Sequence, residues 1–209
     1  MTTIVHVLGL CGSLRRGSFN LGLLHAAQEL APPSMQIGVH DIGPLPFFCP
    51  DWTEVGEPAS VCELKTAIGA ADGLLIATPE YNAAIPGVLK NVIDWASQPR
   101  IESVLHGKPT AIVGCTTGSG GTQRAQIGLR QMLAYVNALT LPSPALLVSH
   151  AHTRFDGSGR LSDTTTRDGL ALLLARFLEW IVDRRAPPES DQMHVHAQLR
   201  QVALNRMRY

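Results

Sequence analysis

The 209-residue sequence has no excess of charge of either sign. Lysine and arginine total 17, and aspartate and glutamate also total 17. A protein that binds bulk nucleic acid usually carries a clear surplus of positive charge. We therefore expect no nucleic-acid partner, and any phosphate group that this chain binds must be met by local donors.

Long hydrophobic runs and paired cysteines are also missing. No apolar run reaches the roughly 20 residues of a membrane helix, and the N-terminal segment "MTTIVHVLGL" starts a strand pattern without the features of a signal peptide. We expect no membrane partner and a cytoplasmic location. The four cysteines at positions 11, 49, 62 and 115 form no C-x-x-C pair, so neither a disulfide framework nor a zinc or redox motif is predicted.

What is present is an alternation of short apolar runs with helical patterns. The predicted strands are residues 4–10, 35–39, 73–78, 111–115 and 145–148, and the predicted helices are residues 21–30, 61–70, 86–96, 122–135 and 170–181. The later strands are nearly continuous hydrophobic runs, which is typical of strands covered on both faces. The pattern predicts an α/β fold: a five-stranded parallel sheet with helices on both faces.

We expect one domain over residues 1–186 and a loosely amphipathic tail over residues 187–209. The tail places apolar residues such as Met193 and Leu199 among charges. Helical packing on a partner subunit and folding on its own domain are the two alternatives for this tail.

The segment "GSLRRGSFN", residues 12–20, follows the first predicted strand and precedes a helix. Such a loop presents backbone N–H groups and the positive end of a helix dipole, so an anion is the natural ligand. The hydroxyls of Ser13 and Ser18, the amide of Asn20 and the guanidinium of Arg15 can complete a phosphate site. A capped helix with solvated arginines is the alternative, and it explains Ser18 and Asn20 but not the whole set.

Two nucleotide motifs are absent from this loop. Gly17 is followed by Ser18 and not by the lysine of a P-loop, and Gly9 and Gly12 have the wrong spacing for G-x-G-x-x-G, although Asp41 could mimic its ribose-binding acid. The remaining candidate ligand is a terminal monophosphate, as on FMN.

A second segment, "TPEYNAAIPGVLKNVIDW", follows the third predicted strand. Pro79 ends the strand, and Glu80, Tyr81 and Asn82 form a turn with free backbone donors and acceptors. A flavin ring needs such groups along one edge and a wall at one face. Tyr81 is the candidate wall or lid.

Together the two segments resemble the NADPH-dependent FMN reductase family, whose motifs read G-S-[LI]-R-x-x-S-x-N and P-E-Y-N-x-S-x-P-x-x-L-K-N-x-[IL]-D-W. The chain departs from the second motif at Ala84, where the family often has serine. The resemblance implies a flavodoxin-like sheet of order 2-1-3-4-5, an FMN cofactor, and NADPH or NADH as hydride donor. It also implies a quinone, free flavin, azo compound or metal oxyanion as acceptor, and a homodimer or homotetramer.

The resemblance also assigns the site residues. Ser13, Arg15, Ser18, Phe19 and Asn20 would hold the phosphate end of FMN, and Pro79, Glu80, Tyr81 and Asn82 would line the ring. The glycine-rich turn "TTGSGGTQ" would approach the far edge of the ring through Thr116, Gly118, Gly121 and Thr122. Arg124 would meet the 2′-phosphate of NADPH or stand as an exposed helix arginine. Since the flavin carries the chemistry, we expect no catalytic acid or base, and Tyr81 and Arg124 would contact substrate.

Three alternatives are weaker. Ser119 suggests a hydrolase, but no histidine or acid is placed to serve it. An electron carrier of flavodoxin type would usually be strongly acidic, and this chain is neutral. The pairs His150/His152 and His194/His196 have no third ligand in view, so no metal is predicted.

Trp95 and Ile93 are larger apolar side chains than a lone surface helix would need to bury, which predicts self-association through residues 86–95.

Overall fold

Within the described residues, the sheet has six strands, all parallel. The computed structural model describes residues 4–52 and 56–184. Its strands are β1 (Val5–Cys11), β2 (Met35–His40), β3 (Gly73–Ala77), β4 (Pro109–Cys115), β5 (Leu139–Thr140) and β6 (Leu146–Val148). They are arranged in the order β2-β1-β3-β4-β5, with β6 also paired to β4. The expected order 2-1-3-4-5 is confirmed.

The predicted fifth strand is divided in two. Leu139 and Thr140 pair with the start of β4, and Leu146 to Val148 pair with its end. Pro142 and Pro144 stand between the two pieces. Because proline has no N–H to donate to a ladder, the strand is interrupted there, and a single strand over 145–148 describes only its second part.

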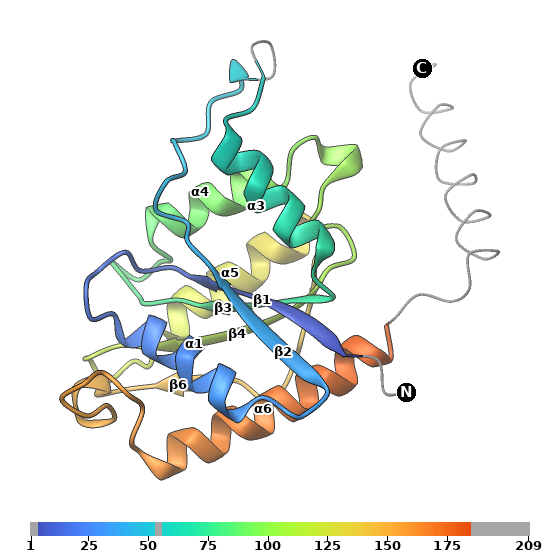
Figure 1. Cartoon of the computed structure of the whole chain (residues 1–209). Helices are drawn as coiled ribbons and strands as arrows, with labels where there is room; N and C mark the ends of the chain where they lie inside the picture. The colour runs from blue at the N-terminus through green and yellow to red at the C-terminus, as the bar shows by residue number, and fades with distance from the viewer. Residues whose placement is uncertain (1–3, 53–55, 185–209) are drawn as a thin grey trace.

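Helices cover both faces of the sheet, as expected. Figure 1 shows α1 (Phe19–Leu30) and α6 (Thr164–Val182) on one face and α3 (Ala59–Ala70), α4 (Gly87–Ala96) and α5 (Gln123–Tyr135) on the other. Two short 3₁₀ helices, η1 (Arg100–Glu102) and η2 (Ala151–Thr153), complete the described elements. Each face of the sheet has its own hydrophobic cluster, one packed under α1 and α6 and the other under α3, α4 and α5.

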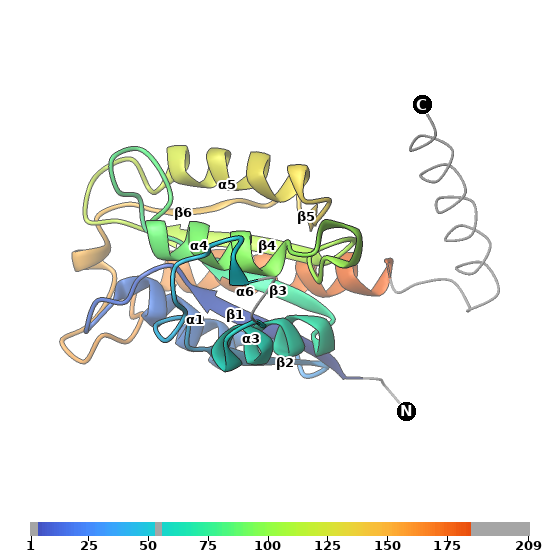
Figure 2. The ribbon, with the colours of Figure 1, turned by 90° about the horizontal axis from the view of Figure 1, so that it is seen from above.

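The loops that follow β1, β3 and β4 gather at one end of the molecule, on the left in Figure 2. Strand order reverses between β1 and β3, because the chain goes from β1 outward to β2 and returns to β3 on the other side. In open parallel sheets this switch point, beyond the carboxyl ends of the strands, is where ligands bind. The fold therefore brings the predicted site loops together.

Within the described residues, no helix combines the length and apolar character needed to cross a membrane. The four cysteines are free, and Cys11 and Cys115 are buried. Cys11 aligns with Ala77, and Ala77 aligns with Val113, two residues before Cys115. Two strand spacings and two residue rises separate the cysteines by about 12 Å, too far for a disulfide. The expected tail over residues 187–209 lies outside the described residues.

Trp95 and Ile93 are buried inside their own chain, with 1% and 4% of their surfaces exposed. The indole Nε1 of Trp95 donates to the Pro46 carbonyl at 2.8 Å, and its ring meets Phe48 edge-on. The segment between β2 and α3 therefore covers α4, and the exposure on which the predicted self-association through residues 86–95 rested is not there.

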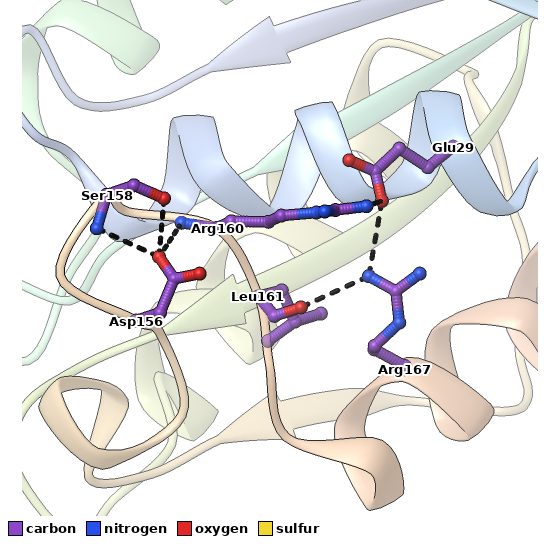
Figure 3. Close-up of polar contacts among 6 residues, drawn as sticks. All are labelled: Glu29, Asp156, Ser158, Arg160, Leu161 and Arg167. Carbon is purple, nitrogen blue, oxygen red and sulfur yellow. Dashed lines mark hydrogen bonds and ion pairs between the residues drawn. The ribbon is translucent and has the colours of Figure 1, made fainter.

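The loop between η2 and α6 is held against α1 by charged side chains (Figure 3). Glu29 of α1 accepts bonds from Arg160 at 3.1 Å and Arg167 at 3.3 Å. Asp156 accepts the N–H groups of Ser158 and Arg160 at 2.9 and 3.0 Å. The Arg160 and Arg167 guanidinium groups hold the pKa of Glu29 below its usual value. The network fixes this loop beside α1, whose first turn forms part of the candidate site.

Candidate functional site

A cavity of about 230 Å³ lies where the three loops meet. Its walls come from the loop after β1, the loop after β3 and the loop after β4. The lining residues are Ser13, Arg15, Ser18, Phe19, Asn20, Pro79, Glu80, Tyr81, Cys115, Thr116 and Thr117.

The first turn of α1 opens into this cavity. Ser18 is the N-cap residue, and its hydroxyl accepts the N–H of Leu21 at 3.3 Å. The N–H groups of Phe19 and Asn20 have no acceptor inside the helix, because the first donors of any α-helix lack one. Arg15 donates to the Gly17 carbonyl at 3.0 Å, and its guanidinium lies 5.3 Å from the centre of the Phe19 ring. Backbone donors, a helix dipole and a guanidinium thus converge, as an anion site requires.

Asn20 lines the cavity, but its side chain already has partners. Its Nδ2 donates to the Cys115 carbonyl and its Oδ1 accepts the Cys115 N–H, both at 3.0 Å, and only 4% of the residue is exposed. The amide therefore joins the start of α1 to the end of β4. We predicted this amide as a phosphate donor, and in the structure both of its polar atoms face backbone.

The loop after β3 contains a tight turn from Tyr81 to Ala84. The N–H of each of these two residues donates to the carbonyl of the other at 3.0 Å. The central residues, Asn82 and Ala83, have φ values of 50° and 63°. Positive φ at both central positions is the type I′ hairpin geometry. Tyr81, 52% exposed, stands at the rim of the cavity, while Asn82 lies outside its lining.

Glu80 turns its carboxylate toward α5. Oε2 accepts the N–H groups of Arg124 and Ala125 at 2.9 and 3.1 Å, and Oε1 accepts Nε of Arg124 at 2.9 Å. Burial pushes the pKa of Glu80 upward, but the bonds from Ala125 and Arg124 outweigh it and hold this pKa below its ordinary value. Glu80 is ionised and paired at neutral pH.

The loop after β4 packs tightly on the sheet. A Cβ on Gly114 would lie 2.3 Å from the Thr122 hydroxyl and 2.4 Å from the Thr78 carbonyl, so only glycine allows this approach. Thr122 is fully buried, and its hydroxyl accepts Nε2 of Gln126 at 3.1 Å. Gly121 adopts a positive φ of 57° against the backbone of Leu147.

Most of the predicted site residues therefore come together. All five site residues predicted in the segment 12–20 line the cavity, and so do Pro79, Glu80, Tyr81 and Thr116. Four residues lie outside the lining: Asn82, Gly118, Gly121 and Thr122, and the substrate candidate Arg124 lies outside it as well. The site residues predicted from the sequence omit Cys115 and Thr117, although Cys115 ends β4 and Thr117 lies in the glycine-rich turn that was predicted to approach the ring.

The features behind the weaker alternatives are also located. Among the described residues, no histidine or carboxylate bonds to Ser119, as a serine nucleophile would need. The His150 and His152 rings are 6.2 Å apart, and the described part of the chain has no cluster of three metal-ligand side chains. His194 and His196 lie outside the described residues.

Comparison with known proteins agrees with this geometry. The family model for NADPH-dependent FMN reductase matches residues 5–153. An NAD(P)H-dependent FMN reductase of Pseudomonas aeruginosa is 43% identical over 87% of this chain and 97% of its own length. A 2-hydroxy-1,4-benzoquinone reductase of Burkholderia sp. is 42% identical over 83% of this chain and 94% of its own length.

Among solved structures, the flavoenzyme NAD(P)H:(acceptor) oxidoreductase FerB of Paracoccus denitrificans superimposes with a TM-score of 0.80 at 32% identity, covering 87% of this chain and 99% of its own. Fold, loop convergence and sequence similarity lead to one conclusion: the chain belongs to the NADPH-dependent FMN reductase family.

Proposed function

We propose that this protein holds FMN with its phosphate in the cavity at the start of α1 and passes hydride from NAD(P)H through the flavin to a quinone. The observation that carries the proposal is the convergence of donors at the cavity. Ser13, Arg15, Ser18 and the first N–H groups of α1 all lie at the switch point of the sheet.

The donor set fits FMN in charge and in size. Glu80 is the acid among the lining residues, and Arg124 already neutralises it, so the cavity keeps the positive charge of Arg15. A volume of about 230 Å³ is below the roughly 300–1,000 Å³ of a whole drug-sized ligand. The cavity therefore suits the phosphate end of a mononucleotide, with the rest of the molecule outside it, beside Tyr81.

Bound FMN would supply the hydride chemistry itself. The chain's own contribution is binding, orientation and access. Ser13, Arg15 and Ser18 anchor the phosphate, and the Tyr81–Ala84 turn offers its backbone to the ring. The exposed Tyr81 limits what can approach. The Glu80 carboxylate at the cavity already accepts two N–H groups of α5, so it is not free to act as a general acid or base.

The names of the relatives guide the choice of substrates. The Pseudomonas relative is named for NAD(P)H and FMN, and the Burkholderia relative for a hydroxybenzoquinone. On that support we propose a quinone as the acceptor and NADPH or NADH as the donor. The family placement favours a reductase over an electron carrier or a hydrolase. The four free thiols and the use of NAD(P)H support a cytoplasmic location.

We also propose that the protein forms a homo-oligomer, for a reason other than exposure of Trp95 and Ile93. A groove of about 630 Å³ runs between α4 and α5, and its lining includes Met132, Tyr135 and Val136. Nearby, Tyr135 is 69% exposed, and Ile127 on α5 is 60% exposed. Apolar surface of this kind is suited to a second copy of the chain.

Cofactor binding tests the phosphate site. The protein stripped of flavin should bind FMN much more tightly than riboflavin, which lacks the phosphate. Arg15→Ala should weaken FMN binding by about 1.5–3 kcal/mol, or roughly 10- to 150-fold, because a charge-assisted bond is lost. Riboflavin binding should barely change. Isothermal titration with both ligands measures this, and Arg16→Ala, a neighbour outside the cavity lining, is the matched control.

Equal affinities for FMN and riboflavin in the unmodified protein would contradict the phosphate site. Failure of the FMN-loaded protein to oxidise NADPH or NADH with a benzoquinone would contradict the proposed reaction.

A further inference from the structure

The start of α5 has no cap of its own. The residue before the helix, Thr122, is left-handed at φ 67° and makes no side-chain bond to the first turn. A usual N-cap residue is extended, and its side chain accepts an N–H two or three residues on. Without such a cap the first N–H groups of α5 need an acceptor from elsewhere.

Glu80 is that acceptor, although it lies 44 residues earlier in the chain. Its carboxylate accepts the N–H groups of Arg124 and Ala125, in the first turn of α5. A negative charge at this end of a helix also complements the helix dipole. The Glu80 side chain is only 9% exposed, whereas the Arg124 side of the contact faces solvent.

Arg124 completes the contact from its own side chain. Its Nε donates to Oε1 of Glu80 at 2.9 Å, and its Nη2 lies 2.8 Å from the same oxygen. The guanidinium is therefore oriented by Glu80, even though 70% of the Arg124 side chain is exposed. This arrangement gives Arg124 a role other than contact with the 2′-phosphate of NADPH.

The pair joins two of the three loops around the cavity. Glu80 directly precedes the Tyr81–Ala84 turn, and Arg124 is the second residue of α5, just after the loop that follows β4. We infer that Glu80 and Arg124 are positioning residues: they lock the Tyr81–Ala84 turn to the start of α5 and thereby fix the rim on which the flavin ring rests. This inference rests on the proposed function for its ligand, but the lock itself is a property of the chain.

The test compares Glu80→Ala, Arg124→Ala and Arg124→Lys with the unmodified protein. Arg176→Ala is the matched control, since it removes an exposed arginine that pairs with Glu179 far from the cavity. Hydrogen–deuterium exchange reports the first turn of α5, and titrations report FMN and riboflavin affinity. Steady-state kinetics give KM for NADPH and for NADH.

We expect exchange at Arg124 and Ala125 to accelerate by about tenfold or more in Glu80→Ala, because alanine has no acceptor for these two N–H groups. The dissociation constants of FMN and riboflavin should rise by similar factors of about 3 to 30 in Glu80→Ala and Arg124→Ala, because the ring's rim loosens while the phosphate site is intact. The dissociation constants of Arg124→Lys should lie between those of Arg124→Ala and those of the unmodified protein. The ratio of KM for NADPH to KM for NADH should stay constant in all variants. The control should match the unmodified protein.

Two results would overturn the inference. One is unchanged exchange at the start of α5 in Glu80→Ala. The other is an Arg124→Ala protein with unchanged flavin affinity and a higher KM for NADPH alone. That result would indicate that Arg124 contacts the 2′-phosphate of NADPH. If the unmodified protein bound no flavin, the proposed function would fail, and the exchange data would still decide whether the lock exists.

Discussion

At the scale of single residues, three of the five non-glycine residues with positive φ in the described chain lie in the loops after β3 and β4, and the other two are Asn137 and His150. Asn82 and Ala83 at the type I′ turn, and Thr122 before α5, are residues other than glycine with positive φ. Asparagine tolerates this region, whereas alanine is disfavoured there by about 1–2 kcal/mol because its Cβ crowds the carbonyl oxygen. Strain of this kind often marks functional sites, where surrounding contacts hold the residue in place.

Ala83→Gly should therefore stabilise the protein. Glycine removes the steric cost at φ 63° but adds freedom to the unfolded chain, so the net gain in free energy of unfolding should be about 0.5–1 kcal/mol. Urea denaturation measures it. The neighbouring change Ala84→Gly, at a residue without positive φ, should be destabilising. A loss of stability in Ala83→Gly would show that the left-handed alanine carries no strain.

Two residues of the recognised motifs have long-range partners that no sequence pattern indicated. Asn20 and Glu80 were predicted as ligands of the flavin, and the structure pairs them with the backbone of Cys115 and of Arg124 and Ala125. An amide or carboxylate satisfies a backbone group as readily as a ligand. Which of the two a side chain bonds depends on which segments the fold brings together. The residue type therefore predicts that Asn20 and Glu80 lie at the site, but not which group each one bonds.

At the scale of elements, α6 has a side-chain N-cap that lies several residues before its apolar stripe. Asp163 is the N-cap residue, and its Oδ2 accepts the N–H of Thr166 at 2.9 Å, while Oδ1 accepts Arg154 at 2.8 Å. The bonds from Thr166 and Arg154 hold the pKa of Asp163 below its usual value. The folded protein thus favours the ionised form.

Asp163→Ala should lower the free energy of unfolding by about 1 kcal/mol at pH 7, since a helix cap is lost. A depressed folded-state pKa gives stability that is complete above the unfolded pKa of about 3.9 and disappears as the pH falls through the folded value. The difference from the unmodified protein should therefore shrink below about pH 4. Thermal unfolding from pH 3 to pH 8 measures it, with the exposed Asp168→Ala as control. A difference that does not depend on pH would contradict the ionic cap.

Element types and order were predictable because periodicity reports burial. The starts and ends of most elements were predicted within two residues, as for α1 at Phe19–Leu30 against residues 21–30. The last helix begins six residues earlier than its apolar stripe, at Thr164, because its first turn is polar and capped. The divided fifth strand was missed because its first piece, Leu139–Thr140, is too short to show an alternation.

At the scale of the whole molecule, the convergence of the three loops was predictable from topology. Parallel strands end at one edge of a sheet, so residues 95 positions apart such as Asn20 and Cys115 meet there. The surface was less predictable. Trp95 is covered by the chain's own segment before α3, and a helical pattern alone does not tell which element covers a face.

The proposed self-association through α4 and α5 gives a prediction at this scale. Tyr135→Glu should shift the protein toward the monomer, since it replaces an exposed aromatic ring with a charge. The Arg100 guanidinium, 4.8 Å from the Tyr135 ring, can pair with that charge, so the monomer itself should remain folded. Light scattering coupled to size-exclusion chromatography measures the mass. Leu172→Glu on α6, on the opposite face, is the control. The same mass for Tyr135→Glu and the unmodified protein would place any interface elsewhere.

The divided strand at the β4 side of the sheet also affects how these molecules behave when crowded. An open sheet edge can recruit a strand from a neighbouring chain, which starts aggregation. Here the edge is cut into pieces of two and three residues, with Pro142 and Pro144 between them. A foreign strand would find no continuous row of N–H donors there. Proline interruption thus protects this edge of the sheet from edge-to-edge growth.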